Sequence, residues 1–388
     1  MLPLLRSLLA PLLNLVFLIL ASGLFNTFVS IRLEMEGTSP EVIGMVVSAL
    51  YVGILIGSLR IERWIAALGH ARSLILFALI SAAIVLAQSI WINPWYWGAL
   101  RLIGGISMAG IFIAIESWFL IQGGKEMRGV ILSIYLGVLY AALSLGQFLI
   151  NVADPMSHLP FYITAFLCAL SVLPMVFIKS TEPVVPKESA RLSLVQLFRL
   201  SPIGFIGGII SGMVLAVTYG LVPIYAKEIG FSIADIGNLM AVIIFGGLSL
   251  QWPMGRWADK GKRRLVLVLA SLLSALFGLS MALIDNHVLL FLVSWAFGGF
   301  AFTLYPLSMA YTCEHVQEHQ ILPATGGFVL SYGIGAIAGP LLAPLAMEQF
   351  GASGVFYFLA AISLLLGLLG LRKPAKVEAA KEVEDQIK

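Results

Sequence analysis

The sequence predicts an all-α integral membrane protein in which twelve transmembrane helices form two pseudo-symmetric six-helix bundles. Three observations predict this class: an apolar composition, twelve long apolar runs and a sequence pattern that occurs twice. Hydrophobic residues make up 60% of the 388 residues and charged residues only 11%, against roughly 25% charged in a soluble domain. A water-soluble fold could not bury so much apolar surface, so we expect lipid to surround the chain.

Each apolar run has about the 20 residues that a transmembrane helix needs. We predict helices because membrane-crossing strands would show the alternating pattern of a barrel. The first run follows Arg6 and is too long for a cleaved signal peptide, so we expect the protein to retain it. The runs are centred near Phe17, Gly53, Ala78, Gly110, Gly137, Ala169, Leu215, Ile244, Leu273, Trp295, Gly335 and Ile362.

Short segments of the first half recur in the second half. Three of them recur at a displacement of 193 residues, and a fourth match lies further along the chain. In a membrane protein, such doubling indicates a transporter with a central site between its halves. The matched segments are Gly37-Thr38-Ser39 with Gly230-Phe231-Ser232, Ile43-Gly44 with Ile236-Gly237, Arg63-Trp64 with Arg256-Trp257, and Gly129–Ser133 with Gly327–Ser331.

The charged residues predict the orientation in the membrane. With a cytoplasmic N-terminus and twelve crossings, nearly all of the 23 Lys and Arg fall in cytoplasmic segments, as the positive-inside rule requires. We therefore expect a multi-pass protein of the bacterial cytoplasmic membrane with both termini in the cytoplasm. The orientation already explains the excess of basic over acidic residues, so this excess does not indicate a nucleic-acid partner. The two cysteines suggest neither a disulfide nor a metal site.

Polar stretches divide the chain into four parts. At the start of the eighth run, Ser232 and Asp235 have the spacing of a helix capping box. The parts are a first six-helix bundle over residues 1–178, a cytoplasmic linker over 179–200, a second six-helix bundle over 201–372 and a charged cytoplasmic tail over 373–388.

Six plus six helices with this repeat resemble the major facilitator superfamily. Gly255–Lys260 followed by Arg263-Arg264 is similar to the loop signature of that superfamily, and Arg101–Gly105 is similar to the signature of its fourth helix. The glycine-proline signature that antiporters carry in the fifth helix lies in the eleventh here, at Gly339-Pro340. The resemblance implies the two-bundle fold but does not support drug–proton exchange.

Further motifs resemble the YcaD-type branch of bacterial facilitators over nearly the whole chain. This resemblance implies a secondary transporter of the cytoplasmic membrane and names no substrate. The motifs are Glu116-Ser117-Trp118, Arg128–Tyr135, Gly146-Gln147 with Asn151–Pro155, and Leu304–Leu307.

Arg101 is the clearest candidate for a functional residue, because a charge inside a membrane helix costs from about 3 to over 10 kcal/mol. One interpretation is a cation in a cavity that attracts an anionic group or senses a nearby proton. The alternative is structural, with the guanidinium capping carbonyls or reaching toward the membrane surface.

Glu116 is the only carboxylate within a predicted span, so it is a candidate proton carrier. It follows Arg101 by fifteen residues, or about 22 Å along a helix, which places it toward the cytoplasmic end. We therefore favour a gate latch, in which carboxylates at the mouth face basic loops and separate when the halves rock. The predicted gating and coupling set is Glu116, Glu314, Arg63, Asp259 and Arg263.

Uncharged polar residues within the spans complete the candidate site. They predict a mostly apolar cavity for a small amphipathic organic solute, although hydrogen bonds between helices would explain each residue equally well. The predicted substrate-binding residues are Arg101, Asn26, Gln147, Tyr219, Tyr140 and Tyr305.

His315–His319 has the His-x-x-Glu-His form of an inverted zinc protease. The repeat assigns this segment to a short inner loop, so a membrane metalloprotease is a remote alternative, and we expect neither enzymatic activity nor a cofactor. A transporter-like sensor or scaffold without flux is the nearer alternative. We predict a monomeric secondary transporter that works by alternating access, with a small-molecule substrate, possible proton coupling and the lipid bilayer as partners.

Overall fold

A computed structural model describes residues 2–122, 124–178, 194–284, 286–316 and 321–372. The predicted tail and most of the predicted linker lie outside these residues. The first half of the chain forms the N-terminal bundle, whose elements are α1 (Leu2–Met35), α2 (Pro40–Leu68), α3 (His70–Ile90), α4 (Pro94–Gln122), α5 (Gly124–Gln147), the 3-10 helix η1 (Phe148–Val152), α6 (Leu159–Leu170) and α7 (Val172–Phe177).

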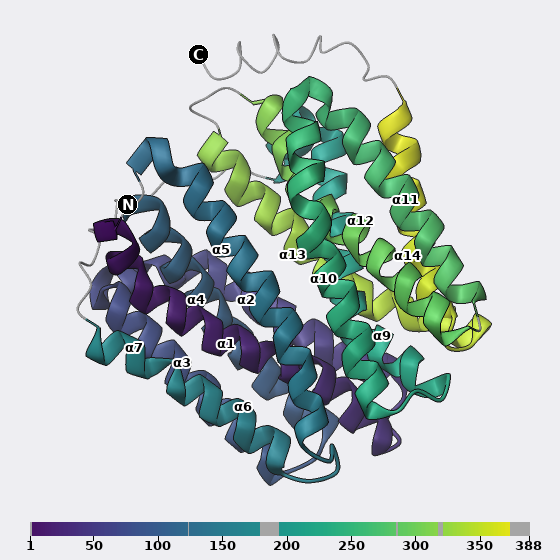
Figure 1. Cartoon of the computed structure of the whole chain (residues 1–388), viewed down its shortest axis with the longest axis horizontal. Helices are drawn as coiled ribbons and strands as arrows, with labels where there is room; N and C mark the ends of the chain where they lie inside the picture. Colours follow the sequence, from purple (N-terminus) through teal and green to yellow (C-terminus); the bar gives the residue numbers. More distant parts are fainter. Residues whose placement is uncertain (1, 123, 179–193, 285, 317–320, 373–388) are drawn as a thin grey trace.

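The second half forms the C-terminal bundle, which lies beside the first (Figure 1). The predicted linker ends in a short helix, α8 (Leu194–Leu200). The remaining elements are α9 (Pro202–Glu228), α10 (Ile233–Trp257), the short segment η2 (Ala258–Lys262), α11 (Arg263–Leu283), α12 (His287–Glu314), α13 (Ile321–Phe350) and α14 (Gly354–Leu371).

All twelve predicted run centres lie in helices. The described residues contain 11 continuous stretches long and apolar enough to cross a membrane. One of them, Ile233–Leu283, holds two crossings, because the backbone leaves helical geometry at Lys260 and Gly261, between α10 and α11. The fold therefore agrees with the twelve-helix prediction.

The sequence repeat is also a repeat of helix packing. Glycines let α2 and α4 approach closely: a Cβ at Gly53 would collide with the Leu102 carbonyl, and one at Gly105 with the Leu50 carbonyl. The contacts recur in the C-terminal bundle, where Gly246 faces the Trp295 carbonyl and Gly298 faces the Ile243 carbonyl. Each of these residues lies 193 positions after its counterpart, so the two bundles are built alike.

Matching turns follow α1 and α9. Gly37 and Gly230 adopt φ values of 77° and 89°, a region that favours glycine because other side chains are strained there. Ser232 and Asp235 form the predicted capping box at the start of α10. We call the end of the molecule with these two turns the turn end, and the opposite end, where α2 and α10 finish, the basic end.

Three polar contacts join the bundles toward the turn end. The Ser48 hydroxyl donates to the Ile337 carbonyl (2.8 Å), and the Ser144 hydroxyl donates to the Ala241 carbonyl (3.0 Å). Residues 48 and 241 are repeat counterparts, as are 144 and 337, so a pseudo-two-fold axis relates the two bonds. The third contact is an ion pair between Glu34 and Lys227, which are counterparts of each other.

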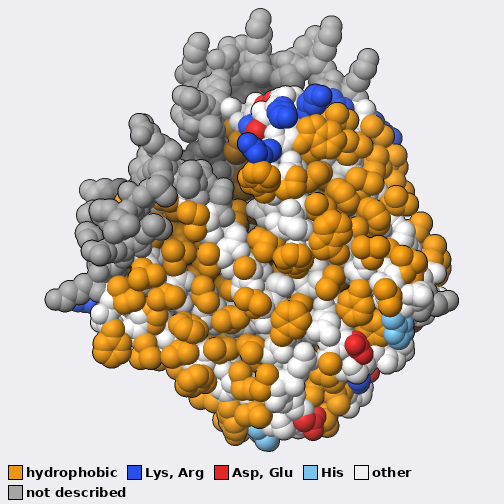
Figure 2. Space-filling model, in the orientation of Figure 1, with side chains coloured by type: hydrophobic (Ala, Val, Ile, Leu, Met, Phe, Trp, Pro, Cys, Tyr) orange, Lys and Arg blue, Asp and Glu red, His pale blue; other side chains and the backbone are white. Residues whose placement is uncertain are grey.

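The outer surface suits a bilayer. Hydrophobic side chains cover most of the face in Figure 2, and Lys and Arg gather at its upper edge, over the junction of α10 and α11. Large apolar side chains such as Ile90, Phe166 and Val288 are more than half exposed, as expected where lipid replaces water.

Candidate functional site: the region between the two bundles

Arg101 lies in the first third of α4 and is buried. Its Nη1 donates to Asn26 Oδ1 (2.9 Å), and its Nη2 donates to the Phe25 carbonyl at 3.4 Å. The guanidinium carbon also lies 5.1 Å from the centre of the Phe25 ring. These contacts hold Arg101 against α1. The predicted structural role, a guanidinium that bonds to neighbouring helix groups, therefore explains Nη1 and Nη2, whereas Nε is unpaired among the described residues.

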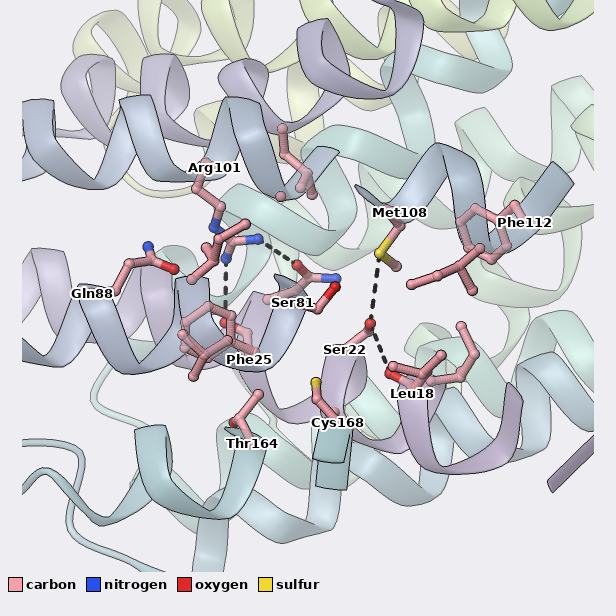
Figure 3. A pocket seen from close by; sticks show the side chains of 18 residues that line it. Leu18, Ser22, Phe25, Ser81, Gln88, Arg101, Met108, Phe112, Thr164 and Cys168 are labelled. Carbon is pink, nitrogen blue, oxygen red and sulfur yellow. Dashed lines mark hydrogen bonds between the residues drawn. The ribbon is translucent and has the colours of Figure 1, made fainter. Parts of the chain in front are cut away.

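Arg101 and Asn26 line two hollows. One lies between the bundles, because Tyr219 and Gly220 of α9 complete its wall together with Tyr51 of α2. The other lies inside the N-terminal bundle among α1, α3, α4 and α6 (Figure 3). Arg101 therefore stands where an interior cavity meets the interface of the two halves.

Aromatic rings from both bundles meet next to this point. Tyr140 of α5 and Tyr219 of α9 both contact the ring of Phe302 on α12. Their ring centroids lie 5.7 and 5.6 Å from the Phe302 centroid. Tyr219 and Tyr51 line the same hollow between the bundles. Three of the predicted substrate-binding residues, Arg101, Asn26 and Tyr219, thus share one region with Tyr140.

Glu116 lies further along α4 and still within its membrane-crossing stretch. The Tyr135 hydroxyl donates to Glu116 Oε1 at 3.0 Å, and Tyr305 of the C-terminal bundle is an electrostatic neighbour of the carboxylate. The Glu116 side chain is exposed. Phenols of both bundles therefore lie near an accessible carboxylate.

Tyr305 connects the two parts of the site. Its ring centroid lies 5.1 Å from that of Tyr332 and 5.3 Å from that of Phe328. Six phenols from both bundles gather in the region of Arg101 and Glu116, and we call this set the tyrosine belt. Its members are Tyr51, Tyr135, Tyr140, Tyr219, Tyr305 and Tyr332.

Gln147 occupies a different environment from the other predicted binding residues. It is fully buried, and its Oε1 accepts a hydrogen bond from the Thr27 hydroxyl at 2.7 Å. It lines neither of the two hollows. Its amide nitrogen is buried without a hydrogen-bond partner among the described residues, so a binding role for Gln147 stays a prediction.

The other residues of the predicted gating set lie at the basic end. Arg263 Nη2 is 3.8 Å from Asp259 Oδ1, and its Nη1 donates to the Ala310 carbonyl at 3.3 Å. Arg63 and Glu314 are exposed. Among the described residues, the hydrogen-bond partner of Glu116 is Tyr135, a phenol of its own bundle.

Sequence reasoning missed Tyr51, Tyr135 and Tyr332, and also Gln88 of α3. Tyr140, Tyr219 and Tyr305 were predicted, but the sequence does not show that the three missed phenols face the same region. Gln88 could have been found, because an amide in a run otherwise free of amides and charges stands out. Which helix face points inward depends on packing, and the sequence pattern alone does not fix it.

The proposed protease motif is only partly described. His315 Nδ1 lies 2.8 Å from the Tyr311 carbonyl oxygen, whereas Glu318 and His319 lie outside the described residues. Within the described part of the chain, no group of three or more His, Cys, Asp or Glu side chains is placed to hold a metal ion.

Comparisons with known proteins agree with this architecture. A sequence profile of the Major Facilitator Superfamily matches residues 204–387. The MFS-type transporter YcaD of Salmonella newport (strain SL254) is 34% identical over 372 residues, which cover 95% of this chain and 96% of the relative.

Solved structures show the same fold at low sequence identity. The nucleoside transporter NupG superposes with a TM-score of 0.76 at 16% identity, over 96% of this chain and 98% of that chain. The D-xylose-proton symporter superposes with a TM-score of 0.77 at 14% identity, over 96% and 98%.

Proposed function

Because the chain belongs to the major facilitator superfamily, and is thus a multi-pass membrane transporter and not an enzyme, we propose that it carries a small amphipathic organic solute by alternating access. The solute binds in the region between the bundles, and the two halves rock to expose it to either side. The observation that carries the proposal is that side chains of both bundles converge there: Arg101 and Asn26 from one, Tyr219 from the other.

The chemistry of this region supports the solute class. Six phenols and Phe302 offer aromatic faces and hydroxyls, whereas Arg101 and Glu116 provide one charge of each sign about 22 Å apart along α4. A sugar would call for many more amides and carboxylates. A molecule with an apolar or aromatic body and few polar groups fits the tyrosine belt better.

The contacts between the bundles support a conformation that is closed at the turn end. Glu34 with Lys227, Ser48 with Ile337 and Ser144 with Ala241 hold the halves together there. We therefore propose that the site is reached from the basic end in this conformation. With the positive-inside orientation, that is the cytoplasmic side of a bacterial inner membrane, with both termini cytoplasmic and the monomer as the working unit.

We further propose Glu116 as the coupling residue. Among the described residues its hydrogen-bond partner is the Tyr135 phenol and no ion pair joins it, so it can take up a proton without losing an ion pair there. Its place between Tyr135 and Tyr305 brings it against both bundles, where a change of charge would bias their arrangement. Arg63, Glu314, Asp259 and Arg263 remain the proposed gating residues of the basic end.

Flux across a sealed membrane tests the function. A thermal-shift screen of the purified protein against metabolites and drugs would first find a ligand, because binding stabilises the folded state by mass action. Proteoliposomes should then take up that ligand with saturation. Binding without saturable uptake would contradict transport and support a membrane sensor or scaffold.

A further inference from the structure

The cavity inside the N-terminal bundle has one polar end and one apolar end. In Figure 3, Gln88 and Arg101 lie at one end, while Leu18, Met108 and Phe112 lie at the other. This cavity is separate from the tyrosine belt, and none of the belt residues lines it.

Gln88 is fully buried, yet neither its amide nitrogen nor its amide oxygen has a hydrogen-bond partner among the described residues. Arg101 Nε is also buried and unpaired. Leaving a buried donor or acceptor unpaired costs about 1–3 kcal/mol, and more for a charged group. Two of these groups, Arg101 Nε and the Gln88 amide nitrogen, are donors at one end of a cavity, and they indicate an occupant that accepts hydrogen bonds from them.

The charge of the cavity indicates the sign of that occupant. Arg101 is the only charged residue among the described lining residues, and within the described chain no ion pair joins it to a carboxylate. A guanidinium at membrane depth is stable when it is paired. An anion that accepts from Arg101 Nε and from the Gln88 amide would pair it, and a carboxylate has the two oxygens for this geometry.

The apolar end and the size indicate the rest of the molecule. The cavity volume is about 70 Å³, several times the least space that one water molecule needs. We propose that the cavity binds a short organic monocarboxylate, with its carboxylate on Arg101 and Gln88 and its alkyl chain toward Met108 and Phe112.

We identify the bound carboxylate with the head group of the transported solute, so this inference rests on the proposed transport function. Arg101, Asn26 and Leu50 line both this cavity and the hollow between the bundles. A carboxylate held at Arg101 thus lies at the boundary between the interior of one bundle and the interface of the two. A longer body attached to it would extend toward Tyr51 and Tyr219.

Thermal stability with butyrate and butyramide tests the proposal, because the two molecules have nearly the same size and differ in charge. Butyrate should raise the melting temperature of the full-length protein, and butyramide should not.

The variant Gln88→Leu tests the amide contact. The butyrate concentration that gives half of the maximal rise in melting temperature should increase about tenfold or more, the scale of a lost hydrogen bond to a charged group. The matched variant Gln251→Leu, on α10 away from the cavity, should respond as the wild type does. Equal shifts with both molecules, or no shift with butyrate, would overturn the proposal.

Cys168 reports the place of binding, because it lines the cavity and is a free thiol. In Cys313→Ser it is the only cysteine, and butyrate should slow its reaction with N-ethylmaleimide severalfold while butyramide should not. Stabilisation by butyrate without this protection would place the anion elsewhere and contradict the assignment. Both readouts measure binding, so they hold even if the proteoliposomes show no flux.

Discussion

Arg101 carries a charge in a membrane-crossing stretch of helix, where a charge is energetically unfavourable. Its neighbours satisfy only part of the hydrogen-bonding capacity of the guanidinium. Two nitrogens bond to α1, and Nε remains for a ligand. We predict that Arg101→Ala lowers solute uptake by at least about tenfold while expression stays normal, because the anchoring charge is lost. Uptake by equal amounts of protein in proteoliposomes measures this. Arg101→Lys keeps the charge but not the forked geometry, so intermediate uptake is expected; full activity of Arg101→Ala would contradict a central role.

Glu116 is predicted to couple transport to protons. Glu116→Gln keeps an oxygen that can accept from Tyr135 but cannot ionise, so uptake should lose its dependence on pH. Uptake measured across a pH series in wild type and variant gives the answer. Tyr135→Phe, which removes the hydrogen bond and leaves the carboxylate, should retain the dependence. If Glu116→Gln keeps the pH dependence and only shifts the balance between the two orientations, Glu116 is a latch.

At the residue scale, sequence reasoning found the charged groups and three of the six phenols, Tyr140, Tyr219 and Tyr305. A lone Arg or Glu in an apolar run is visible without a structure, and Asn26 joins Arg101 as a direct partner. Tyr51 and Tyr332 read as ordinary apolar positions of their helices. Gln147 was also predicted to bind solute. Its amide oxygen accepts from Thr27, its amide nitrogen has no partner among the described residues, and its role stays a prediction.

The close glycine contacts belong to the scale of helices. We predict that Gly53→Ala lowers the melting temperature, because the added methyl group would push α2 away from α4, at a cost of about 1–3 kcal/mol. Gly246→Ala should have a similar effect, since the same contact recurs between α10 and α12. The control is Gly137→Ala on α5, where an added Cβ meets open space. Equal melting temperatures for all three variants would contradict the repeated packing.

Helix number and helix starts could be predicted because their signals are local. Apolar runs fix the crossings, and Ser232 with Asp235 fixes the start of α10. The short helix α8 was not predicted, since it lies in a stretch that was assigned to the linker by its polar composition. Contacts between helices involve residues far apart in sequence, so the pairing of α2 with α4 stayed invisible although its glycines repeat at 193 residues.

At the scale of the whole molecule, the pseudo-two-fold axis brings Glu34 against Lys227 at the turn end. A pseudo-two-fold axis can bring a residue of α1 next to its repeat counterpart on α9. Opposite charges on such a pair favour closure of the turn end. We predict that Glu34→Lys opens the turn end by placing two lysines together, and that the double variant Glu34→Lys/Lys227→Glu closes it again. Access of a water-soluble thiol reagent to Ser48→Cys in a Cys168→Ser/Cys313→Ser background measures the opening.

The most direct test of the two-bundle rocking motion is a pair of distance measurements by double electron–electron resonance. Spin labels at Ser39→Cys and Ile229→Cys report the turn end, and labels at Leu68→Cys and Lys260→Cys report the basic end, each in the protein without Cys168 and Cys313. In Glu34→Lys the turn-end distance should lengthen while the basic-end distance shortens. A turn-end distance that lengthens with no change at the basic end, or no change at either end, would contradict alternating access by rigid bundles.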